Sequence, residues 1–410
     1  MSKITHDVLI IGGGPAGLSL AALLARGGVR VACIDREDPA QQASAVFDGR
    51  TTAISLGSRR ILERAGIWPA LAQYGCAIET IQITDGDSPT LVTFAHHEAG
   101  GEAFGWIVEN RILRRALFDH ARATKNIDHI APAAVTALIR TPDRVTATLA
   151  DGRIVSAPLL VGADGRNSFV RDWAGLGARQ WSYKQRAVIC TVEHDNPHNH
   201  IALENFRPEG PFAVLPMTDG ENGAHRSSVV WTEHGPEKDS ALTYDQAVFD
   251  AALTARFPDF YGAIKQIGKR AAYPLGLIHA HDYAAARTVL IGDAAHGIHP
   301  IAGQGLNLGF RDIAVLADLV IGADDPGIDD VVYEYQRKRR PDNMAMAGTT
   351  DILNRLFSNN VTPVRALRRF GLRLVDRTAP VKKFFMAQAM GMGSGMPGLL
   401  PGLMNDRDAA

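Results

Sequence analysis

One apolar run ending in closely spaced glycines constrains the fold more than any other feature. Residues 7–11 read DVLII, and Gly12, Gly14 and Gly17 follow in the pattern GxGxxG. A helical stretch over 15–26, with Pro15 at its start, and a second apolar run over 29–34 complete a βαβ unit ending at Asp35. The unit predicts a dinucleotide fingerprint: Gly12 permits the turn, Gly14 lets the backbone approach a pyrophosphate, and Gly17 allows close packing. A turn that only packs a helix on a sheet is the alternative.

Two later segments repeat the pattern of a strand followed by glycine. Residues 159–161 lead into Gly162-Ala163-Asp164-Gly165-Arg166, and residues 288–291 lead into Gly292-Asp293. A carboxylate at Asp293 can bond a ribityl hydroxyl, and the glycine-rich stretch 303–307 can offer backbone N–H groups to a flavin ring. This second motif lies about 280 residues after the first. A site for NAD alone does not need a second contact so far along the sequence. The pair of motifs therefore favours FAD, with a plain glycine-rich turn before a helix as the alternative.

Alternating residues in 186–192 and 227–232 predict antiparallel strands between these motifs. We expect an α/β fold: a Rossmann-like FAD-binding domain with an inserted, mainly antiparallel β substrate domain and a C-terminal helical segment. The expected FAD-binding domain is discontinuous, at 1–74, 101–178 and 274–345. The substrate domain takes 75–100 and 179–273, and the helical region takes 346–410.

The motifs together resemble the class A flavoprotein aromatic hydroxylases, which have the para-hydroxybenzoate hydroxylase fold. The stretches 48–55 (DGRTTAIS), 108–111 (VENR), 292–296 (GDAAH) and 298–309 (IHPIAGQGLNLG) are similar to the ubiquinone-biosynthesis branch of that family. The likeness spans about residues 6–345. It implies an FAD-dependent monooxygenase that hydroxylates a polyprenylated phenol with NAD(P)H and O2, through a C4a-hydroperoxyflavin.

The resemblance also assigns roles to matched positions. It places a non-covalent FAD on the turn around the first helix, with the adenosine end at the second strand and the flavin ring at the third motif. The implied cofactor-binding residues are Gly12, Gly14, Pro15, Ala16, Gly17, Asp35, Arg36, Arg50, Thr52, Ala53, Arg111, Val135, Asp164, Gly292, Asp293, Pro300, Gly303, Gly305, Leu306 and Asn307. Without the family, Arg50 and Arg111 read as surface arginines, and Asp164 with Arg166 as a solvated pair in a strand-end turn.

No catalytic residue can be assigned from the sequence. His296 and His299 lie on the third motif, where a histidine bonded to loop carbonyls is the expected state and a proton shuttle the alternative. No His, Cys, Asp and Glu cluster has the sequence spacing of metal ligands, so we expect no metal. Ring regiochemistry depends on the shape of the substrate domain, where no motif matches.

The charge balance excludes one class of partner. There are 43 Lys and Arg against 44 Asp and Glu, so the chain as a whole has no basic field for nucleic acid. Three cysteines cannot build a disulfide framework, no apolar run is long enough to cross a bilayer, and the first strand begins too early for a signal peptide. We expect a cytoplasmic protein, with a peripheral contact at the inner membrane as an added expectation.

That membrane contact rests on the C-terminal region. Residues 362–385 contain seven Arg or Lys against Asp376 alone. Val364, Leu367, Gly371, Leu374 and Val375 fall on one helical face and Arg365, Arg369 and Arg373 on another, which predicts a basic amphipathic helix for a membrane surface or a biosynthetic complex. A packing helix with a solvated basic face is the alternative. Two further functions stay open: a flavin-dependent reductase of isoprenoid chains, and a non-catalytic flavin-bearing subunit.

Overall fold

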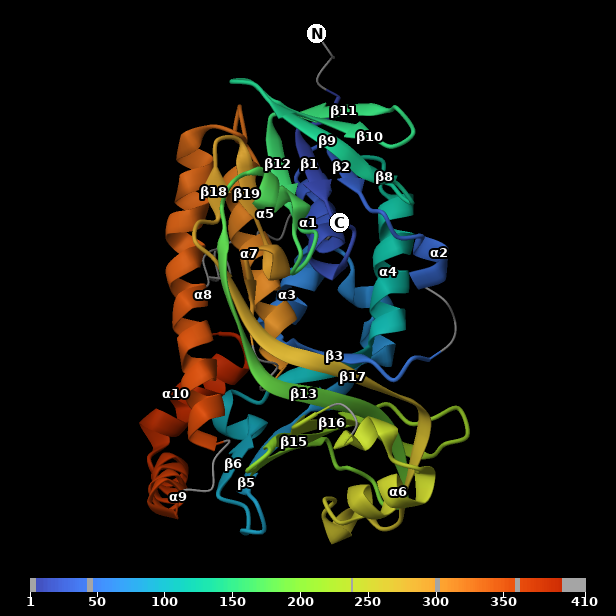
Figure 1. The fold of residues 1–410 in the computed structure, drawn as a ribbon, viewed down its shortest axis with the longest axis vertical. Helices are drawn as coiled ribbons and strands as arrows, with labels where there is room; N and C mark the ends of the chain where they lie inside the picture. The colour runs from blue at the N-terminus through green and yellow to red at the C-terminus, as the bar shows by residue number, and fades with distance from the viewer. Residues whose placement is uncertain (1–4, 43–46, 237–238, 299–302, 358–361, 393–410) are drawn as a thin grey trace, which may run out of the picture.

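The computed structural model describes residues 5–42, 47–236, 239–298, 303–357 and 362–392. Two large sheets organise the fold, one in the upper and one in the lower half of Figure 1. Helices lie beside the upper sheet, and three C-terminal helices run down one side to the edge of the lower sheet (Figure 1).

The upper sheet has six strands in the order β18-β19-β12-β1-β2-β8. Its strands are β1 (Val8–Ile11), β2 (Val31–Ile34), β8 (Ile127–Ile130), β12 (Leu159–Gly162), β18 (Ala284–Ala285) and β19 (Thr288–Leu290). All neighbours are parallel except β18 and β19. The strands β1, β2, β12 and β19 are apolar runs buried on both faces, as is typical of a parallel sheet, whereas the edge strands β8 and β18 are partly exposed. The strands predicted at 7–11, 29–34, 159–161 and 288–291 are confirmed within one or two residues.

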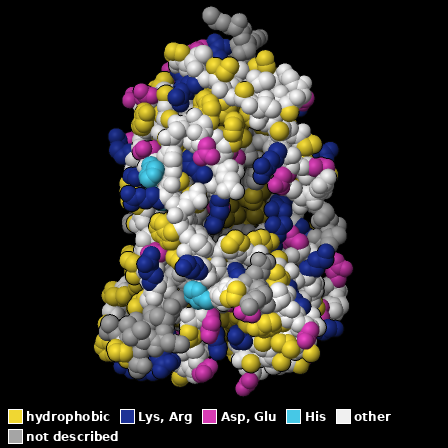
Figure 2. All heavy atoms as spheres, in the orientation of Figure 1, with side chains coloured by type: hydrophobic (Ala, Val, Ile, Leu, Met, Phe, Trp, Pro, Cys, Tyr) yellow, Lys and Arg dark blue, Asp and Glu magenta, His cyan; other side chains and the backbone are white. Residues whose placement is uncertain are grey.

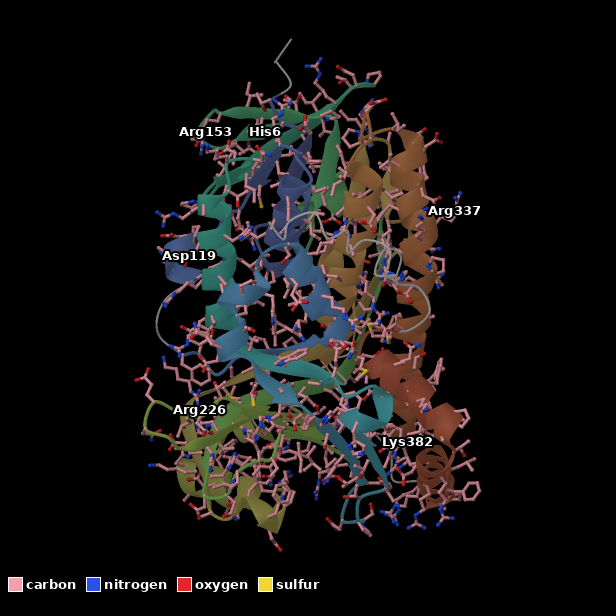
Figure 3. All side chains as sticks on the ribbon, turned by 180° about the vertical axis from the view of Figure 1, so that it is seen from behind. His6, Asp119, Arg153, Arg226, Arg337 and Lys382 are labelled. Atoms are coloured by element: carbon pink, nitrogen blue, oxygen red, sulfur yellow. The ribbon has the colours of Figure 1, made fainter. Side chains whose placement is uncertain are left out.

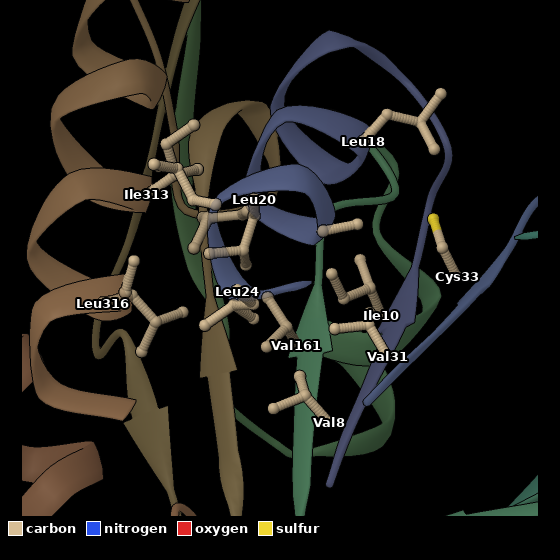
Figure 4. Packing of buried hydrophobic residues seen from close by; sticks show 14 of the residues in the cluster. Val8, Ile10, Leu18, Leu20, Leu24, Val31, Cys33, Val161, Ile313 and Leu316 are labelled. Carbon is tan, nitrogen blue, oxygen red and sulfur yellow. The ribbon is translucent and has the colours of Figure 1, made fainter. Parts of the chain in front are cut away.

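Two helices and a small meander complete the core around this sheet. Leu20 and Leu24 of α1 (Pro15–Arg26) pack with Ile313 and Leu316 of α7 (Gln304–Val320) and with Val8 of β1 (Figure 4). The meander sheet consists of β9 (Val135–Arg140), β10 (Val145–Leu149) and β11 (Ile154–Ala157). Sites at the carboxyl ends of β1, β12 and β19 are therefore held by one continuous hydrophobic core.

The lower sheet has eight strands in the order β20-β17-β13-β16-β15-β14-β5-β6. Its strands are β5 (Thr80–Asp85), β6 (Val92–Ala95), β13 (Ala178–His194), β14 (Ile201–Arg207), β15 (Gly210–Met217), β16 (His225–His234), β17 (Ile264–Ala280) and β20 (His296–Gly297). Only β14 and β5 pair in parallel, so the predicted antiparallel strands are confirmed. The 17-residue strands β13 and β17 pair along nearly their whole length and link this sheet to the third motif through β20.

A third sheet lies between the two large ones (Figure 1). It consists of β3 (Thr51–Ser55), β4 (Cys76–Ile78) and β7 (Gly105–Glu109). The remaining helices are α2 (Pro39–Gln42), α3 (Leu56–Arg64), α4 (Asn110–Ala123), α5 (Phe169–Trp173) and α6 (Gln246–Thr254), with short 3₁₀ turns that include Gly292–Ala294. The structure confirms the predicted α/β fold class with its inserted antiparallel sheet.

The C-terminal region is helical, as predicted, but it is not one continuous basic helix. Its helices are α8 (Asp329–Phe357), α9 (Thr362–Arg377) and α10 (Ala379–Ala389). Residues 382 and 383 therefore lie on a different helix from the arginines of α9. Within the described part of the chain, no helix combines the length and the apolar character that crossing a membrane requires.

Helix α9 is held to the lower sheet by a buried carboxylate. Asp85, at the end of β5, is almost fully buried and pairs with both Arg368 and Arg369. Lys382 of α10, visible from behind in Figure 3, pairs with Glu98 and Asp376. Three of the seven cations therefore serve docking within the molecule.

We predict that Asp85→Ala releases α9 from the sheet. Removing one partner of a buried ion pair leaves an uncompensated charge, at a cost of about 3–5 kcal/mol. Arg368 is 4% exposed, so its guanidinium would have to move to water. Limited proteolysis should cut the variant after residue 357 much faster than the parent, whereas Asp87→Ala, two residues on and exposed, should leave the rate unchanged. Equal rates for both variants would show that other contacts hold the helix.

Candidate active site

The turn between β1 and α1 contains several glycines, and the reason for glycine differs from one position to the next. Gly12 has φ +110°, and a Cβ there would lie 2.2 Å from the carbonyl oxygen of Ala163. A Cβ on Gly17 would lie 1.9 Å from the carbonyl oxygen of Gly12. A Cβ on Gly14 meets nothing within 4 Å. Gly12 and Gly17 are thus needed for packing, whereas Gly14 faces open space at the N-terminus of α1, where a pyrophosphate is favoured.

Asp35 closes this turn from the end of β2. One carboxylate oxygen accepts from the backbone N–H of Gly13 at 2.5 Å, and the other accepts from Glu37 at 2.8 Å. Gly13 in turn has no room for a side chain, because a Cβ would lie 2.9 Å from the Cβ of Asp35. The predicted ribose ligand therefore also fixes the fingerprint loop, and Arg36 beside it is exposed.

A cavity of about 820 Å³, lined by four arginines, three carboxylates, two glutamines and a proline, extends from this point. Its lining includes Arg36, Asp48, Arg50, Arg111, Arg114 and Pro132. The face of the molecule that carries α2 and α4 is hollowed at its centre, with hydrophobic side chains deep in the hollow and Lys or Arg side chains on its rim (Figure 2). Such a lining suits a bound anion.

The arginines at this cavity are held by neighbouring carboxylates. Arg50 bonds Asp48 through Nε at 2.7 Å, and Arg111 bonds Glu109 through Nε at 2.6 Å. Burial, with the charge of Arg50 as a further cause, lowers the pKa of the Arg114 guanidinium. Arg114 lies three residues after Arg111 on α4 and was missed from the sequence, although that spacing puts both on one helical face. Four arginines and three carboxylates line the cavity, so it offers guanidinium donors to a diphosphate without a large excess of positive charge.

The third motif meets the first one through small residues. Gly292 has φ +55°, and a Cβ there would be 3.5 Å from the Cβ of Ala16 at the start of α1. Gly309 of α7 faces the same two residues, at 3.5 and 3.8 Å. Segments about 280 residues apart in the sequence therefore lie side by side, and one extended ligand bound from both sides stays a prediction.

Asn307 links the start of α7 to strand β3. Its side-chain amide donates to the carbonyls of Ala53 and Gly303, and its oxygen accepts from Ser55 N–H, all at 3.0 Å. Gly303 has φ +63° and packs on Ala53, whereas Gly305 has open space at its Cβ position. The Asn307 side chain is thus committed to structure, and the backbone around Gly305 is the part free to face a ring.

Most of the remaining predicted cofactor-binding residues bond or pack with other residues of the protein. Thr52 bonds Asn110, Leu306 is partly buried in the main core, and Val135 begins β9 in that core. Both oxygens of Asp164 are committed, one to Ser168 Oγ at 2.5 Å and one to Val170 N–H at 3.1 Å. Asp293 is half exposed, with Arg166 Nε at 3.4 Å. Pro300 and His299 lie outside the described residues.

His296 does not have the partner that we expected. Its Nε2 lies 2.5 Å from Asp312 Oδ2, so a buried carboxylate and not a loop carbonyl holds the ring. Asp312 also accepts from Arg339 Nε at 2.8 Å and from the backbone N–H of Gly292 at 3.0 Å. All four groups are buried, which makes Asp312 the common anchor of the third motif.

A cysteine–histidine cluster that sequence spacing did not reveal lies between strand β4 of the third sheet and the segment that leads into β14. The Sγ of Cys76 is 3.8 Å from both His198 Nε2 and His200 Nδ1, within the range of possible metal ligands. The same nitrogens lie 2.9 Å from the Met217 carbonyl and 3.1 Å from the Ala77 carbonyl. Protonated ring nitrogens bonding those carbonyls account for the cluster without an ion.

Comparison with known proteins identifies the class. A family model described as FAD binding domain matches residues 5–349, so the chain belongs to this family and is an FAD-dependent monooxygenase. The crystal structure of p-nitrophenol 4-monooxygenase PnpA from Pseudomonas putida DLL-E4 superposes with a TM-score of 0.77 at 20% identity, covering 96% of this chain and 100% of that one. That likeness confirms the fold.

Two curated relatives identify the branch. Ubiquinone hydroxylase UbiL from Rhodospirillum rubrum is 45% identical over 404 residues, which is 97% of this chain and 93% of the relative. The 3-demethoxyubiquinol 3-hydroxylase of Escherichia coli K12 is 32% identical over 398 residues, which is 96% of this chain and 100% of the relative. The chain is thus a member of the ubiquinone-biosynthesis branch of the FAD hydroxylases, as the sequence motifs indicated.

Proposed function

We propose that this enzyme hydroxylates the aromatic ring of a polyprenylated phenol, using FAD, NAD(P)H and O2. Its relatives are named for ubiquinone hydroxylation. The structural observation that carries the proposal is an apolar face of the lower sheet that turns toward β3 and the start of α7. Leu215, Ile83 and Val230 on that face are only partly buried. Partly exposed apolar side chains beside a cofactor site suit a prenylated ring.

In this proposal the cofactor lies between the first motif, at the start of α1, and the third motif, at the start of α7. Bound FAD accepts hydride from NAD(P)H and activates O2. The backbone at Gly14 and the cluster of Arg50, Arg111 and Arg114 hold the diphosphate. Asp35 bonds the ribose of the adenosine end, and Asp293 bonds the ribityl chain. Backbone around Gly305 orients the ring system, and the apolar sheet face keeps water from the reacting carbon.

Substrate-stimulated NAD(P)H oxidation with O2 uptake tests the function. The purified yellow protein should consume one O2 per hydroxylated prenylphenol, and a deletion strain should accumulate the unhydroxylated quinone precursor. A reductase of isoprenoid chains would consume NAD(P)H without O2, and a non-catalytic subunit would consume neither. Either result would overturn the proposal, and the accumulated precursor would name the ring position.

We also propose that α9 and α10 contact an anionic membrane surface from which such a substrate is taken. Phe370, Leu374 and Phe384 are 65%, 54% and 57% exposed. Arg365, Arg373, Arg377 and Lys383 are exposed and make no ion pair with any described residue. Exposed aromatic residues among cations are typical of helices that lie at a lipid interface.

The double variant Phe370→Ser/Phe384→Ser should lose binding to vesicles containing anionic lipid. Two large apolar side chains contribute about 1.5–3 kcal/mol each on full burial, so sedimentation with vesicles should fall at least about tenfold. Ile352→Ser, which removes an equally exposed residue from α8, is the matched control. Sedimentation of the double variant equal to that of the parent would contradict the membrane contact.

A further inference from the structure

Strand β14 presents one carboxylate to the interior between the two large sheets. Successive strand residues point to opposite faces. Leu203 packs in the cluster that contains Phe249 and Leu253 of α6, whereas Ala202 packs with Leu56 and Ile107, on the side of the FAD-binding elements. Glu204 shares the face of Ala202, so its side chain points away from α6 and toward the FAD-binding side.

The register of the sheet shows what surrounds Glu204. Ile83 of β5 and Ala213 of β15 lie directly opposite it, and Val230 lies opposite Ala213. This row of the face is therefore apolar on both sides of the carboxylate. One row along, Ser228 accepts a hydrogen bond from Thr51 of β3 at 3.0 Å.

The flavin-binding strand borders the same face. Ala53 of β3, which packs on Gly303 and bonds Asn307, belongs to one hydrophobic cluster with Ile81, Ile83 and Leu215. The row containing Glu204 and the backbone proposed to hold the flavin ring thus flank one apolar cluster. A ring placed between them would meet Glu204 from the sheet side.

Glu204 has an environment that is unusual for a carboxylate. It makes no hydrogen bond or ion pair with any residue that the structure describes, yet it keeps partial exposure to solvent. Burial alone raises its pKa to about 7. The charged groups that face it along the sheet are Asp85 and the paired Arg368 and Arg369, and none of them contributes to the shift. An unpaired internal carboxylate destabilises a fold and is typical of a functional site.

We propose that Glu204 is the general base that accepts the phenolic proton of the substrate, an inference that rests on the proposed phenol hydroxylation. The phenolic O–H bond breaks, a carboxylic O–H bond forms, and the electron pair left on oxygen enriches the ring for attack by electrophilic oxygen. The proton returns to the product phenol or to water as the site opens. An acceptor titrating near neutral pH is suited to this transfer.

Binding gives a readout independent of turnover. An ionised Glu204 accepts the phenol's hydrogen bond more strongly than a protonated one, so affinity for a prenylphenol should rise as the pH increases through about 7. Affinity for its O-methyl ether should not change with pH. Quenching of flavin fluorescence by each ligand measures both. In Glu204→Gln the pH dependence should vanish, and in Glu209→Gln, an exposed carboxylate of the same hairpin, it should persist.

Turnover and stability complete the test. Glu204→Gln should lose about 100-fold or more in kcat, the usual scale of a general base. The Glu204→Gln variant should have a Tm equal to or higher than that of the parent at pH 8, because the parent holds the unpaired Glu204 carboxylate at that pH. A fluorinated phenol that is already ionised at the assay pH should restore its rate to within about threefold of the parent.

The outcomes separate the two proposals. Parent protein that fails to turn over any prenylphenol contradicts the proposed function. Parent turnover with an unimpaired Glu204→Gln variant, or a loss that the acidic phenol does not rescue, contradicts the role of Glu204 alone. A variant that loses FAD or folds less stably also contradicts it, because a structural role would then explain the loss.

Discussion

Gly14→Val should leave the protein folded and abolish FAD binding. Gly14 has extended backbone angles (φ −71°, ψ −177°) that valine adopts readily, and a Cβ there meets no protein atom within 4 Å. The added methyl groups would instead occupy the space in front of the α1 N-terminus, where the pyrophosphate must approach the backbone. We expect FAD affinity to fall by at least about 100-fold, measured by flavin fluorescence, with the circular dichroism of the apoprotein unchanged.

Gly17→Ala provides the contrast. Its Cβ would lie 1.9 Å from a backbone oxygen of Gly12, so β1 and α1 must separate. We expect a loss of about 3 kcal/mol or more in unfolding free energy, together with FAD binding. Gly348→Ala, on the exposed side of α8, is the control and should be neutral or slightly stabilising. A Gly14 variant that retains FAD would show that the cofactor does not approach this turn.

These two glycines also show what sequence can predict. The fingerprint is local: a strand, a turn and a helix within 35 residues, whose spacing fixes their geometry. The strands before Gly162 and Gly292 were predictable for the same reason. The roles of Gly14 and Gly17 follow from the same local pattern, whereas the packing partner of Gly12 does not, because Ala163 lies about 150 residues away.

The residues that sequence reasoning missed depend on register and tertiary contact. Glu204 stands out only once the pairing of β14 with β5 and β15 shows its apolar neighbours. Asp85 has no local signal in the sequence, because its partners Arg368 and Arg369 lie more than 280 residues away. The sequence analysis treated the seven cations of residues 362–385 as part of one basic helix. The structure instead divides them between α9 and α10, and it buries the side chain of Arg368.

The two ends of the site differ in how they are held. The first motif is fixed by close backbone packing of its glycines and by the hydrogen bonds of the Asp35 carboxylate to the loop. The third motif is fixed by a buried charge, because Gly292 and His296 both depend on Asp312. The third motif, where we propose that the flavin ring binds, therefore depends on the ion pair between Asp312 of α7 and Arg339 of α8.

Asp312→Ala should therefore be among the most destabilising single changes in this chain. It would leave Arg339, which is fully buried, with Asp342 as its remaining carboxylate, and Gly292 N–H without an acceptor. Breaking one partner of a buried pair costs about 3–5 kcal/mol. Urea unfolding at pH 7 measures the loss, and flavin fluorescence should show weaker FAD binding because the third motif loses its anchor.

Asp318→Ala is the matched control on the same helix. Asp318 pairs with Arg64 at 2.6 Å but is partly exposed, so its loss should cost about 0–1 kcal/mol. The double variant Asp312→Leu/Arg339→Met should recover much of the stability, because it removes the buried charges together. Equal losses for Asp312→Ala and Asp318→Ala would contradict the anchoring role.

The effect has a defined pH dependence. Burial alone would raise the pKa of Asp312, but the charges of His296 and Arg339 outweigh burial and hold that pKa well below its usual range. A carboxylate with a depressed pKa stabilises the fold fully above its unfolded pKa of about 4 and loses that contribution as the pH falls toward the folded value. The stability gap between parent and Asp312→Ala should thus be constant from pH 7 to about 5 and narrow below about 4. A gap that widened in acid would mean that Asp312 is not ionised in the folded protein.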